Sequence, residues 1–381
     1  MSAMRHPHSF RFHHAAELLE LFEESSLPLD RCASNYFRAN SAIGSKDRKE
    51  IAELVYNTTR WRGLLDALTK STSWAERVSF YQTINPLDYV SRADLPLHIR
   101  CSFPKLLFDH LVSHFGEERA FTLCLDCNTA APVVIRTNPL KTTREALLYR
   151  LPPEMKPRPS PNSPYAIFLE GRPQLLSLPA YQEGHFELQD EGSQLVAGCI
   201  TPLPGERVLD MCAGAGGKSL AFAHHMEGRG QLYLHDVRAH ALQESRRRLR
   251  RAGIENAQFL LPGHVQLGLL KKKMDWVVVD VPCSGSGTWR RNPDMKWRFN
   301  LADLEEKVAL QREIVREAVK YLRPGGRLVY ATCSLFPEEN EQQVAHFTET
   351  YGLKLTKEPF SSWPVKDGMD GLFAATLSDP R

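Results

Sequence analysis

The second half of the chain alternates short apolar runs rich in β-branched residues with amphipathic helical stretches, and this alternation most strongly constrains the fold. Strands are predicted at 207–211, 231–235, 258–261, 276–280 and 327–331, and helices at 218–225, 239–252, 301–322 and 338–350. Strands that alternate with helices predict an α/β fold with a doubly wound, mostly parallel sheet and right-handed crossovers. We therefore expect a Rossmann-like domain over 186–381.

Two smaller parts are predicted before this domain. Residues 1–130 carry helical patterning, since Ile51, Leu54, Val55 and Thr58 share one helical face, and they predict a helical domain. Residues 131–185 contain two short strand patterns, at 133–136 and 166–169, and a short helix at 143–150. Six prolines interrupt the stretch between that helix and the second strand. We expect a small α+β module there.

Composition limits the class of protein without selecting a function. With 381 residues the chain suits two or three domains, and its formal net charge of +3 permits binding to nucleic acid without requiring it. Its 8 cysteines do not suit a disulfide scaffold in a chain of this length, so we expect reduced thiols and a cytoplasmic protein. Cys124 and Cys127 form a single C-x-x-C without a second pair at zinc spacing, and we expect no metal site. Neither a signal peptide nor a membrane span is expected.

A glycine-rich turn follows the first strand of the α/β domain. Gly214, Gly216 and Gly217 would let the backbone approach a ligand, and the start of the next helix favours an anion such as a carboxylate. The turn matches neither a Walker A loop nor the dinucleotide fingerprint. Asp236 ends the second strand, where an acidic residue typically binds ribose hydroxyls. The pattern indicates a nucleoside-containing cofactor, although an ordinary strand–helix turn is the alternative.

Two cysteines each follow a predicted strand of this sheet, Cys283 in Asp-Val-Pro-Cys-Ser-Gly and Cys333 in Ala-Thr-Cys-Ser. Residues just past the carboxyl ends of parallel strands line the ligand crevice, so both thiols would face one site. A thiolate that adds to C6 of cytosine makes C5 nucleophilic enough to accept a methyl group. Asp280 at the strand end could hold the ring, and Lys218 could raise the local positive potential. Each cysteine taken alone also fits an inert buried thiol.

Several segments jointly resemble the Sun family of RNA (cytosine-C5)-methyltransferases, and most closely its RsmB-type members, which act on 16S ribosomal RNA. The matching segments keep the family order: QDEGSQL (189–195), VLDMCAGAGGKS (208–219), DVPCSG (280–285), RRNPDMKW (290–297), YATCS (330–334), PEEN (337–340) and DGLFAA (370–375). Segments 35–40 and 47–61 resemble the family's NusB-like helical RNA-binding domain, and 136–141 resembles the module before the catalytic domain. The resemblance implies a class I methyltransferase fold, S-adenosylmethionine as the cofactor, RNA as the partner and a monomer.

The resemblance also implies roles for individual residues. Cys333 would attack C6, Cys283 would assist release of the product, and Asp280 and Lys218 would hold and activate the base. The implied cofactor contacts are Cys212, Ala213, Gly214, Ala215, Gly216, Gly217, Lys218, Asp236 and Asp280. Where the family usually has an aspartate near the adenine, this chain has Leu-Pro-Gly-His at 261–264, so either His264 takes its place or the contact is missing.

Basic segments suggest where RNA would bind. Arg246, Arg247, Arg248, Arg250 and Arg251 cluster on one predicted helix, where a solvated face and an RNA contact are equally acceptable interpretations. The lysines at 271–273 fit a loop. Trp289, Arg290 and Arg291 follow Cys283 closely, and we expect them to contact RNA, because splayed bases stack on aromatic rings and arginine planes.

Three alternatives compete with an rRNA methyltransferase. A tRNA-directed enzyme would use the same chemistry. A non-catalytic RNA-binding assembly factor would use the same scaffold, since fold alone does not give function. An amino-group methyltransferase would usually carry Asp/Asn-Pro-Pro-Tyr/Phe where this chain has Val281-Pro282-Cys283.

Overall fold

The computed structural model describes residues 9–380 of the chain, which divide into two compact units. The first unit contains residues up to 130 together with 289–300, and the second contains 131–288 and 301–381. The segment 289–300 therefore belongs to the helical unit, although the sequence places it between two elements of the α/β domain. The predicted module at 131–185 lies in the same unit as the α/β domain.

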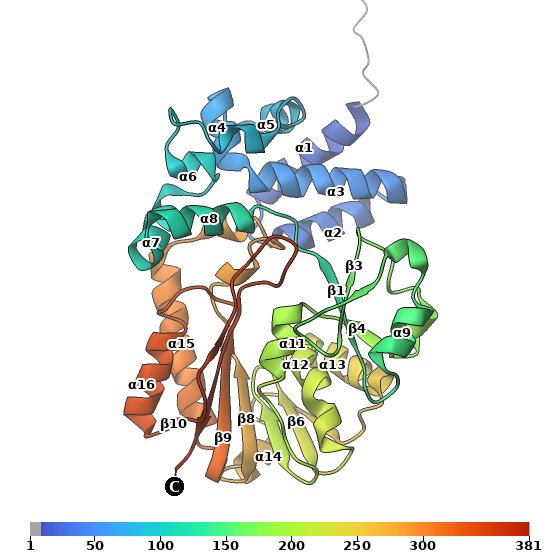
Figure 1. The fold of residues 1–381 in the computed structure, drawn as a ribbon, viewed down its shortest axis with the longest axis vertical. Helices are drawn as coiled ribbons and strands as arrows, with labels where there is room; N and C mark the ends of the chain where they lie inside the picture. The colour runs from blue at the N-terminus through green and yellow to red at the C-terminus, as the bar shows by residue number, and fades with distance from the viewer. Residues whose placement is uncertain (1–8, 381) are drawn as a thin grey trace, which may run out of the picture. The chain divides into compact units, whose positions relative to one another are not determined.

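The first unit is helical, as the sequence predicts (Figure 1). Ile51 and Val55 of α3 are fully buried against α1 and α5, which explains the apolar face of that helix. Leu54, expected on the same face, is only partly buried. The helices are α1 (Ser9–Glu23), α2 (Leu29–Ala39), α3 (Ser45–Arg60), α4 (Arg62–Thr69), α5 (Trp74–Tyr81), α6 (Leu97–Arg100), α7 (Lys105–Phe115) and α8 (Glu117–Cys127), with the 3₁₀ turns η1 (Pro86–Tyr89) and η5 (Met295–Arg298).

The second unit begins with a small antiparallel sheet. Its strands are β1 (Val133–Thr137), β2 (Arg158–Pro159), β3 (Ala166–Leu169) and β4 (Phe186–Leu188), in the order β2-β3-β1-β4. The helices α9 (Arg144–Arg150) and α10 (Pro179–Gln182) accompany it, with the 3₁₀ turn η2 (Pro153–Met155). Ile135 and Ile167 are fully buried in the core of this module.

The large sheet confirms the predicted α/β class. Its order is β10-β12-β9-β8-β5-β6-β7, and β11 pairs with β12. The five strands from β9 to β7 are parallel neighbours, while β12 is antiparallel to β9. The strands are β5 (Arg207–Asp210), β6 (Gln231–His235), β7 (Ala257–Leu260), β8 (Met274–Asp280), β9 (Leu322–Thr332), β10 (Lys354–Leu355), β11 (Phe360–Ser361) and β12 (Phe373–Ser378).

The parallel strands are connected by the helices α12 (Gly217–Phe222), α13 (Ala239–Ala252), α14 (Val265–Leu269) and α15 (Leu301–Ala318), with the 3₁₀ turns η3 (Ala223–Met226) and η4 (Ser286–Thr288). The helix α11 (Glu191–Ala197) precedes β5, and α16 (Glu341–Tyr351) follows β9. The helix predicted over 218–225 ends at Phe222 and continues as η3. The helix predicted to 322 ends at Ala318, and β9 begins at Leu322.

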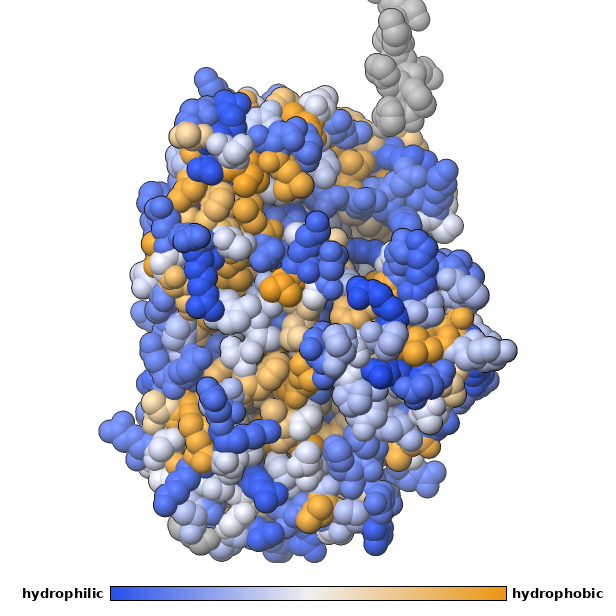
Figure 2. Space-filling view, in the orientation of Figure 1, coloured by the Kyte–Doolittle hydropathy of each residue, from blue (hydrophilic) through white to orange (hydrophobic). Residues whose placement is uncertain are grey.

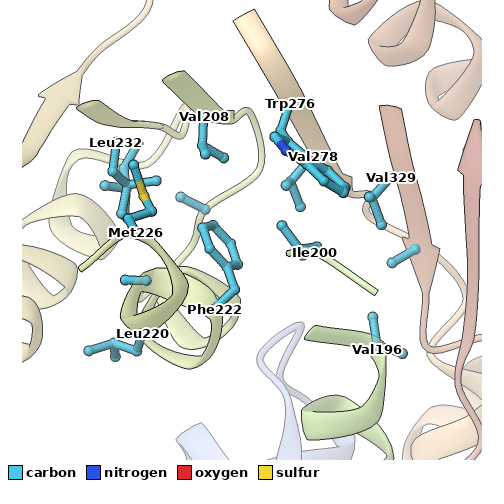
Figure 3. Close-up of a cluster of buried hydrophobic side chains, with 14 of the residues drawn as sticks. Val196, Ile200, Val208, Leu220, Phe222, Met226, Leu232, Trp276, Val278 and Val329 are labelled. Carbon is cyan, nitrogen blue, oxygen red and sulfur yellow. The ribbon is translucent and has the colours of Figure 1, made fainter. Parts of the chain in front are cut away.

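The middle of the large sheet is buried on both faces. Trp276 and Val278 of β8 face one apolar cluster, shown in Figure 3, whereas Val277 and Val279 face another. This alternation follows from the two-residue period of a strand. Because neither face of β8 meets solvent, the strand is a rigid support for whatever follows its carboxyl end.

No helix among residues 9–380 is long and apolar enough to cross a membrane. On the face drawn in Figure 2, hydrophobic side chains are interspersed with hydrophilic ones.

Candidate active site

Two thiols meet beyond the carboxyl ends of neighbouring strands. Cys283 follows β8 and Cys333 follows β9, and the two strands pair in parallel with Asp280 opposite Ala331. The two Sγ atoms are 3.3 Å apart, and the backbone N–H of Cys333 donates to Sγ of Cys283 over 3.4 Å. Both side chains are partly exposed and both are free thiols. The structure thus brings together the two cysteines that the sequence singled out.

An ion pair between a buried lysine and a partly exposed aspartate lies near the thiols. Nζ of Lys218, on α12, donates to Oδ2 of Asp280 over 2.5 Å. Burial works against the charge on Lys218, but the Asp280 carboxylate outweighs it and raises the pKa of the ammonium group. Cys333 also contributes to the raised pKa of Lys218, which indicates that the ammonium group and this sulfur interact electrostatically.

The electrostatic surroundings of the two thiols differ. The contact with Cys333, burial and the Glu339 carboxylate all raise the pKa of the Cys283 thiol well above its ordinary value. Two sulfur atoms at this distance cannot both carry a negative charge without strong repulsion. The Glu339 carboxylate and the neighbouring sulfur therefore favour a neutral thiol at Cys283.

The side chain of Glu339 supports the Cys283 loop, a role that no sequence pattern predicts. It is fully buried, and its carboxylate accepts from the backbone N–H of Ser284 (2.8 Å), the Ser284 hydroxyl (2.5 Å) and the Gln311 amide (2.9 Å). Gln311 also donates to the carbonyl of Pro282 over 3.1 Å. Glu339 is part of the PEEN segment, which follows Cys333, but no spacing in the sequence shows that its side chain contacts the Cys283 loop.

Three serine hydroxyls join the two cysteine loops. The Oγ atoms of Ser284, Ser286 and Ser334 lie 3.1 to 3.2 Å from one another. Ser286 and Ser334 are almost completely buried. Ser286 Oγ also accepts from the backbone N–H of Leu335 over 2.7 Å. The network fixes the spacing of the two loops and therefore of the two sulfur atoms.

Gly287 and Gly371 allow two backbone segments to lie very close to each other beside the Cys333 loop. The N–H of Gly287 donates to the carbonyl of Cys333, and the N–H of Gly371 donates to the carbonyl of Gly287, both over 2.9 Å. A Cβ atom on Gly287 would lie 1.9 Å from the carbonyl oxygen of Gly371. The DGLFAA segment therefore packs against Gly287, two residues after the DVPCSG segment, through backbone contact.

The glycine-rich turn has the geometry expected for a ligand loop. Gly214 and Gly216 have φ of 52° and 78°, in the left-handed region that favours glycine. A Cβ on Gly216 would lie 2.5 Å from Oγ of Ser245, whereas a Cβ on Gly217 would meet nothing within 4 Å. Of the other predicted contacts here, Ala213 and Ala215 lie in the same turn, and Cys212 is partly buried, which raises the pKa of its thiol.

Asp236 lies next to this turn, as predicted. Its carboxylate accepts from the backbone N–H of Gly214 over 2.8 Å. It also accepts from the Arg238 guanidinium at both oxygens, over 2.9 and 3.0 Å, and from the Arg238 backbone N–H. Burial opposes ionisation of Asp236, but the Arg238 bonds outweigh it and lower the pKa of the carboxyl. A ribose at this position would share Asp236 with Arg238 or displace its side chain.

Asp210, at the end of β5, is a second acidic group that the sequence analysis passed over. It is 1% exposed, and burial raises its pKa to about 7. Its Oδ2 accepts from the Ser219 hydroxyl over 2.8 Å, while Oδ1 is buried without a partner among the described residues. The carboxyl acts electrostatically on both Lys218 and Cys212.

His264 is exposed in the loop after β7 and caps α14, where its Nδ1 accepts from the backbone N–H of Gln266 over 3.2 Å. With Nδ1 accepting, the neutral ring carries its proton on Nε2, which is left to donate to a ligand. Taken together, the open glycine turn and the acidic groups at three neighbouring strand ends fit a polar nucleoside cofactor. Asp236, Asp280 and Lys218 provide its polar surroundings.

The predicted RNA contact at Trp289 and Arg290 is wrong. Trp289 is 2% exposed and packs edge-on against Phe103, with the ring centroids 5.4 Å apart. Arg290 is 1% exposed, and its carbonyl accepts from Arg60 over 2.9 Å. These side chains are packed in the core of the helical unit and cannot stack on a base.

Comparison with known proteins gives two family matches. Residues 197–378 match the 16S rRNA methyltransferase RsmB/F model, and residues 103–175 match the RsmF/B-like ferredoxin-like domain. The probable ribosomal RNA small subunit methyltransferase B of Synechocystis is 32% identical over 271 residues, which cover 70% of this chain and 60% of the relative. The ribosomal RNA small subunit methyltransferase B of Salmonella arizonae is 34% identical over 261 residues, which cover 66% of this chain and 60% of the relative. The chain thus spans about 60% of the length of these curated relatives.

Two solved structures share the fold. A methyltransferase homologue from Pyrococcus horikoshii is 27% identical with a TM-score of 0.66, and the match covers 76% of this chain and 99% of that one. NSun6 from the same organism, solved with SFG, is 22% identical with a TM-score of 0.66, covering 73% and 99%.

Proposed function

Residues 197–378 belong to the RsmB/F family of methyltransferase domains, and we propose that the chain uses this domain to methylate C5 of a cytosine in RNA, with S-adenosylmethionine as the methyl donor. The observation that carries the proposal is the pair of thiols 3.3 Å apart at two strand ends, beside the Lys218–Asp280 ion pair. The favoured substrate is 16S ribosomal RNA, because the curated relatives named above act on RNA of the small ribosomal subunit. The protein acts as a monomer.

Cys333 is the nucleophile in this proposal. Its thiolate attacks C6, so an Sγ–C6 bond forms and the electrons of the C5–C6 double bond move toward the ring carbonyl and N3. Lys218 stabilises the thiolate before attack and then donates a hydrogen bond to the ring as negative charge develops. Asp280 accepts from the exocyclic amino group and holds the base in place.

Cys283 acts after the methyl group has been transferred. Its pKa is high while Cys333 is a thiolate, because the neighbouring sulfur disfavours a second negative charge. Once Cys333 is bound to C6 as a thioether, that charge is gone and Cys283 can lose its proton. The Cys283 thiolate then removes the proton from C5, the Sγ–C6 bond breaks, and Cys333 leaves as a thiolate.

The residues proposed to hold the cofactor are those of the glycine turn from Cys212 to Lys218, with Asp236, Asp280 and His264 around it. When bound, S-adenosylmethionine supplies an electrophilic methyl group at its sulfonium centre. Asp236 would accept from ribose hydroxyls, and the Nε2 proton of His264 would face the adenine in place of the acidic group usual in the family.

The test uses Cys283→Ala protein incubated with S-adenosylmethionine and 16S rRNA. Without the releasing thiol, the Cys333–C6 bond should persist, and a protein–RNA adduct should survive on a denaturing gel. The Cys283→Ala/Cys333→Ala variant should give no adduct, and Cys199→Ala, which changes a buried thiol elsewhere in the same unit, should behave as wild type.

Other outcomes separate the alternatives. Adduct formation with tRNA but not with rRNA would favour the tRNA enzyme. An adduct that requires Cys283 and not Cys333 would reverse the proposed order of the cysteines. If the wild-type protein binds no S-adenosylmethionine and produces no 5-methylcytidine, the non-catalytic assembly factor would be favoured instead.

A further inference from the structure

The arginine-rich helix α13 divides its arginines between two tasks. Arg248 and Arg251 both pair with the buried Glu187 on β4, and Arg248 also donates to the carbonyl of Ala215 over 2.8 Å. These two side chains hold the small sheet to the methyltransferase domain within the second unit. Arg247 pairs with Glu244 on its own helix. The basic cluster in the sequence is therefore mostly structural.

Arg246 and Arg250 are the exceptions. Both are exposed, and neither guanidinium has a carboxylate partner among the described residues. Arg246 lies over the ring of Phe259 on β7, with its Cζ 4.9 Å from the ring centroid. An arginine plane held on an aromatic ring keeps its hydrogen-bond donors directed outward and unused.

The two arginines line an open hollow along the edge of the large sheet. Its volume is about 630 Å³, and its lining includes Arg246, Arg250, Gln258, Phe259, His264 and Gln266. A second hollow of about 450 Å³ shares Arg246 and Phe259 and adds Arg247 and Gln243. Glu255 contributes a carboxylate to the first hollow. Together they form a groove, here called the β7 groove, between α13, the edge strand β7 and the loop that carries His264.

We propose that the β7 groove binds the backbone of the RNA substrate, away from the cytosine that is methylated. Arginine donors without protein partners suit phosphate oxygens, and arginine planes beside an aromatic ring suit stacked bases. The side-chain amides of Gln266 and Gln258 bond to one another over 2.6 Å and give the groove adaptable polar contacts. The inference rests on the proposed function and adds a second place where RNA is held.

The groove is separate from the thiol pair. In the sheet order, β7 lies four strands from β9, which carries Cys333, and three from β8, which carries Cys283. At about 4.8 Å per strand, the groove lies roughly 19 Å from the Cys333 strand. When the target cytosine of an RNA occupies the active site, the nucleotides that flank it could reach the β7 groove.

A protein strand added to β7 is the competing occupant, since β7 pairs only with β6 in the part of the chain that the structure describes. The observations favour RNA. β7 has only four residues, and short edges bordered by charged side chains resist strand addition. The arginines also give the groove a positive charge that a polyanion would neutralise.

The experiment measures binding of oligo(U) RNA to the full chain without S-adenosylmethionine. Oligo(U) contains no cytosine, so its binding does not depend on the methylation chemistry. The test variant is Arg246→Gln/Arg250→Gln, and the matched control is Arg229→Gln/Arg316→Gln, which removes the same charge from exposed positions elsewhere in the same unit. The Arg246→Lys/Arg250→Lys variant keeps the charge.

If each arginine contacts one phosphate, the test variant should bind about tenfold more weakly at 0.15 M salt. The slope of log affinity against log salt should fall by about 1.4, and the control should change neither quantity. The Lys variant should recover most of the affinity. Photo-crosslinking with 4-thiouridine oligonucleotides should attach RNA to the peptide that contains Phe259 in the wild type.

Equal affinity of the test and control variants would overturn the inference, as would crosslinks that fall only outside 239–266. A loss of S-adenosylmethionine affinity with unchanged oligo(U) binding would also overturn it, because the groove would then hold the cofactor's nucleoside. Failure of the proposed function would give a different result from failure of the groove inference. Oligo(U) would still bind through the groove, but no 5-methylcytidine would form.

Discussion

At Glu339, a single buried carboxylate accepts from three donors, all belonging to or supporting the Cys283 loop. The sequence could identify both cysteines because each follows a strand pattern. It could not identify Glu339 as their support, because the contact depends on how two loops 55 residues apart meet. Trp289 and Arg290 illustrate the opposite error, in which residue types that often contact RNA serve instead to build a core.

Replacing Glu339 by Gln should slow methylation without preventing RNA binding. The amide nitrogen would oppose the Ser284 N–H, so the Cys283 loop should shift, and misplacement of a reacting group by about 1 Å can reduce rates 10²-fold. We expect kcat to fall about 10- to 100-fold and KM for RNA to stay within about twofold. Because the carboxylate raises the pKa of Cys283, the limb of the pH–rate profile that reports this thiol should move to lower pH.

The control for this variant is Glu341→Gln, an exposed change on the following helix, which should alter neither kcat nor the pH profile. A lower kcat with an unmoved pH profile would mean that Glu339 stabilises the fold without influencing Cys283.

Asp210 gives a prediction about pH and stability. Its folded pKa of about 7 lies above the ordinary value of 3.8, so the folded state binds more protons than the unfolded state between these values. The contribution of Asp210 to the free energy of unfolding is therefore fully present below about pH 4 and is lost as the pH rises toward 7. Asp210→Asn should remove this slope in urea titrations between pH 4 and 7. An identical slope in wild type and variant would contradict the prediction.

Among the elements, the parallel core from β5 to β9 was predictable, because its strands are continuous apolar runs separated by amphipathic helices. The antiparallel strand β12 was missed: Phe373–Ser378 is just as apolar, but only pairing with β9 defines it as a strand. The helix α12 is shorter than predicted, because the chain after Phe222 continues as the 3₁₀ turn η3.

The backbone contact between Gly287 and Gly371 predicts a strong effect of one methyl group. Gly287→Ala would place Cβ 1.9 Å from the Gly371 carbonyl oxygen, and backbone cannot move aside as a flexible side chain can. We expect a loss of about 1–3 kcal/mol in the free energy of unfolding, with loss of activity, since Gly287 also donates to the Cys333 carbonyl. Gly268→Ala, on α14 with nothing within 4 Å of its Cβ, should be neutral or slightly stabilising. Thermal denaturation of both variants checks this, and equal stability would contradict it.

Over the whole molecule, the helical unit includes a segment from far along the chain. Lys296 is buried in this unit and donates to the Arg60 carbonyl (2.8 Å) and to Oδ1 of Asn128 (2.7 Å). Trp297 donates to the carbonyl of Thr59 over 2.7 Å, and Leu29 N–H donates to Asp294 over 3.2 Å. The domain boundary was predicted at 130 because helical patterning gives way there to strand patterning, but no local pattern shows that 289–300 returns to the helices.

This return predicts that residues 1–130 alone are poorly folded. Without the segment, the acceptors at Thr59, Arg60 and Asn128 lose their donors, and the apolar surface that the segment covers, such as the Phe103 ring packed on Trp289, is exposed to water. A fragment that joins 1–130 to 289–300 through a flexible linker should melt cooperatively and at higher temperature than 1–130. The control is the same linked fragment with the substitutions Lys296→Ala and Trp297→Ala in its 289–300 segment. Equal melting of all three would show that the helices are complete without the segment.

The placement of 289–300 also bears on the order in which the chain can fold as it is synthesised. A helical domain at the start of a protein can usually fold while the rest is still being translated. Here the buried positions around Lys296 and Trp297 stay open until residue 300 has left the ribosome, after β5 to β8 have already emerged. The first unit to be made is thus among the last to be finished, and a ribosome that stalls before residue 289 leaves it with exposed apolar surface for chaperones to cover.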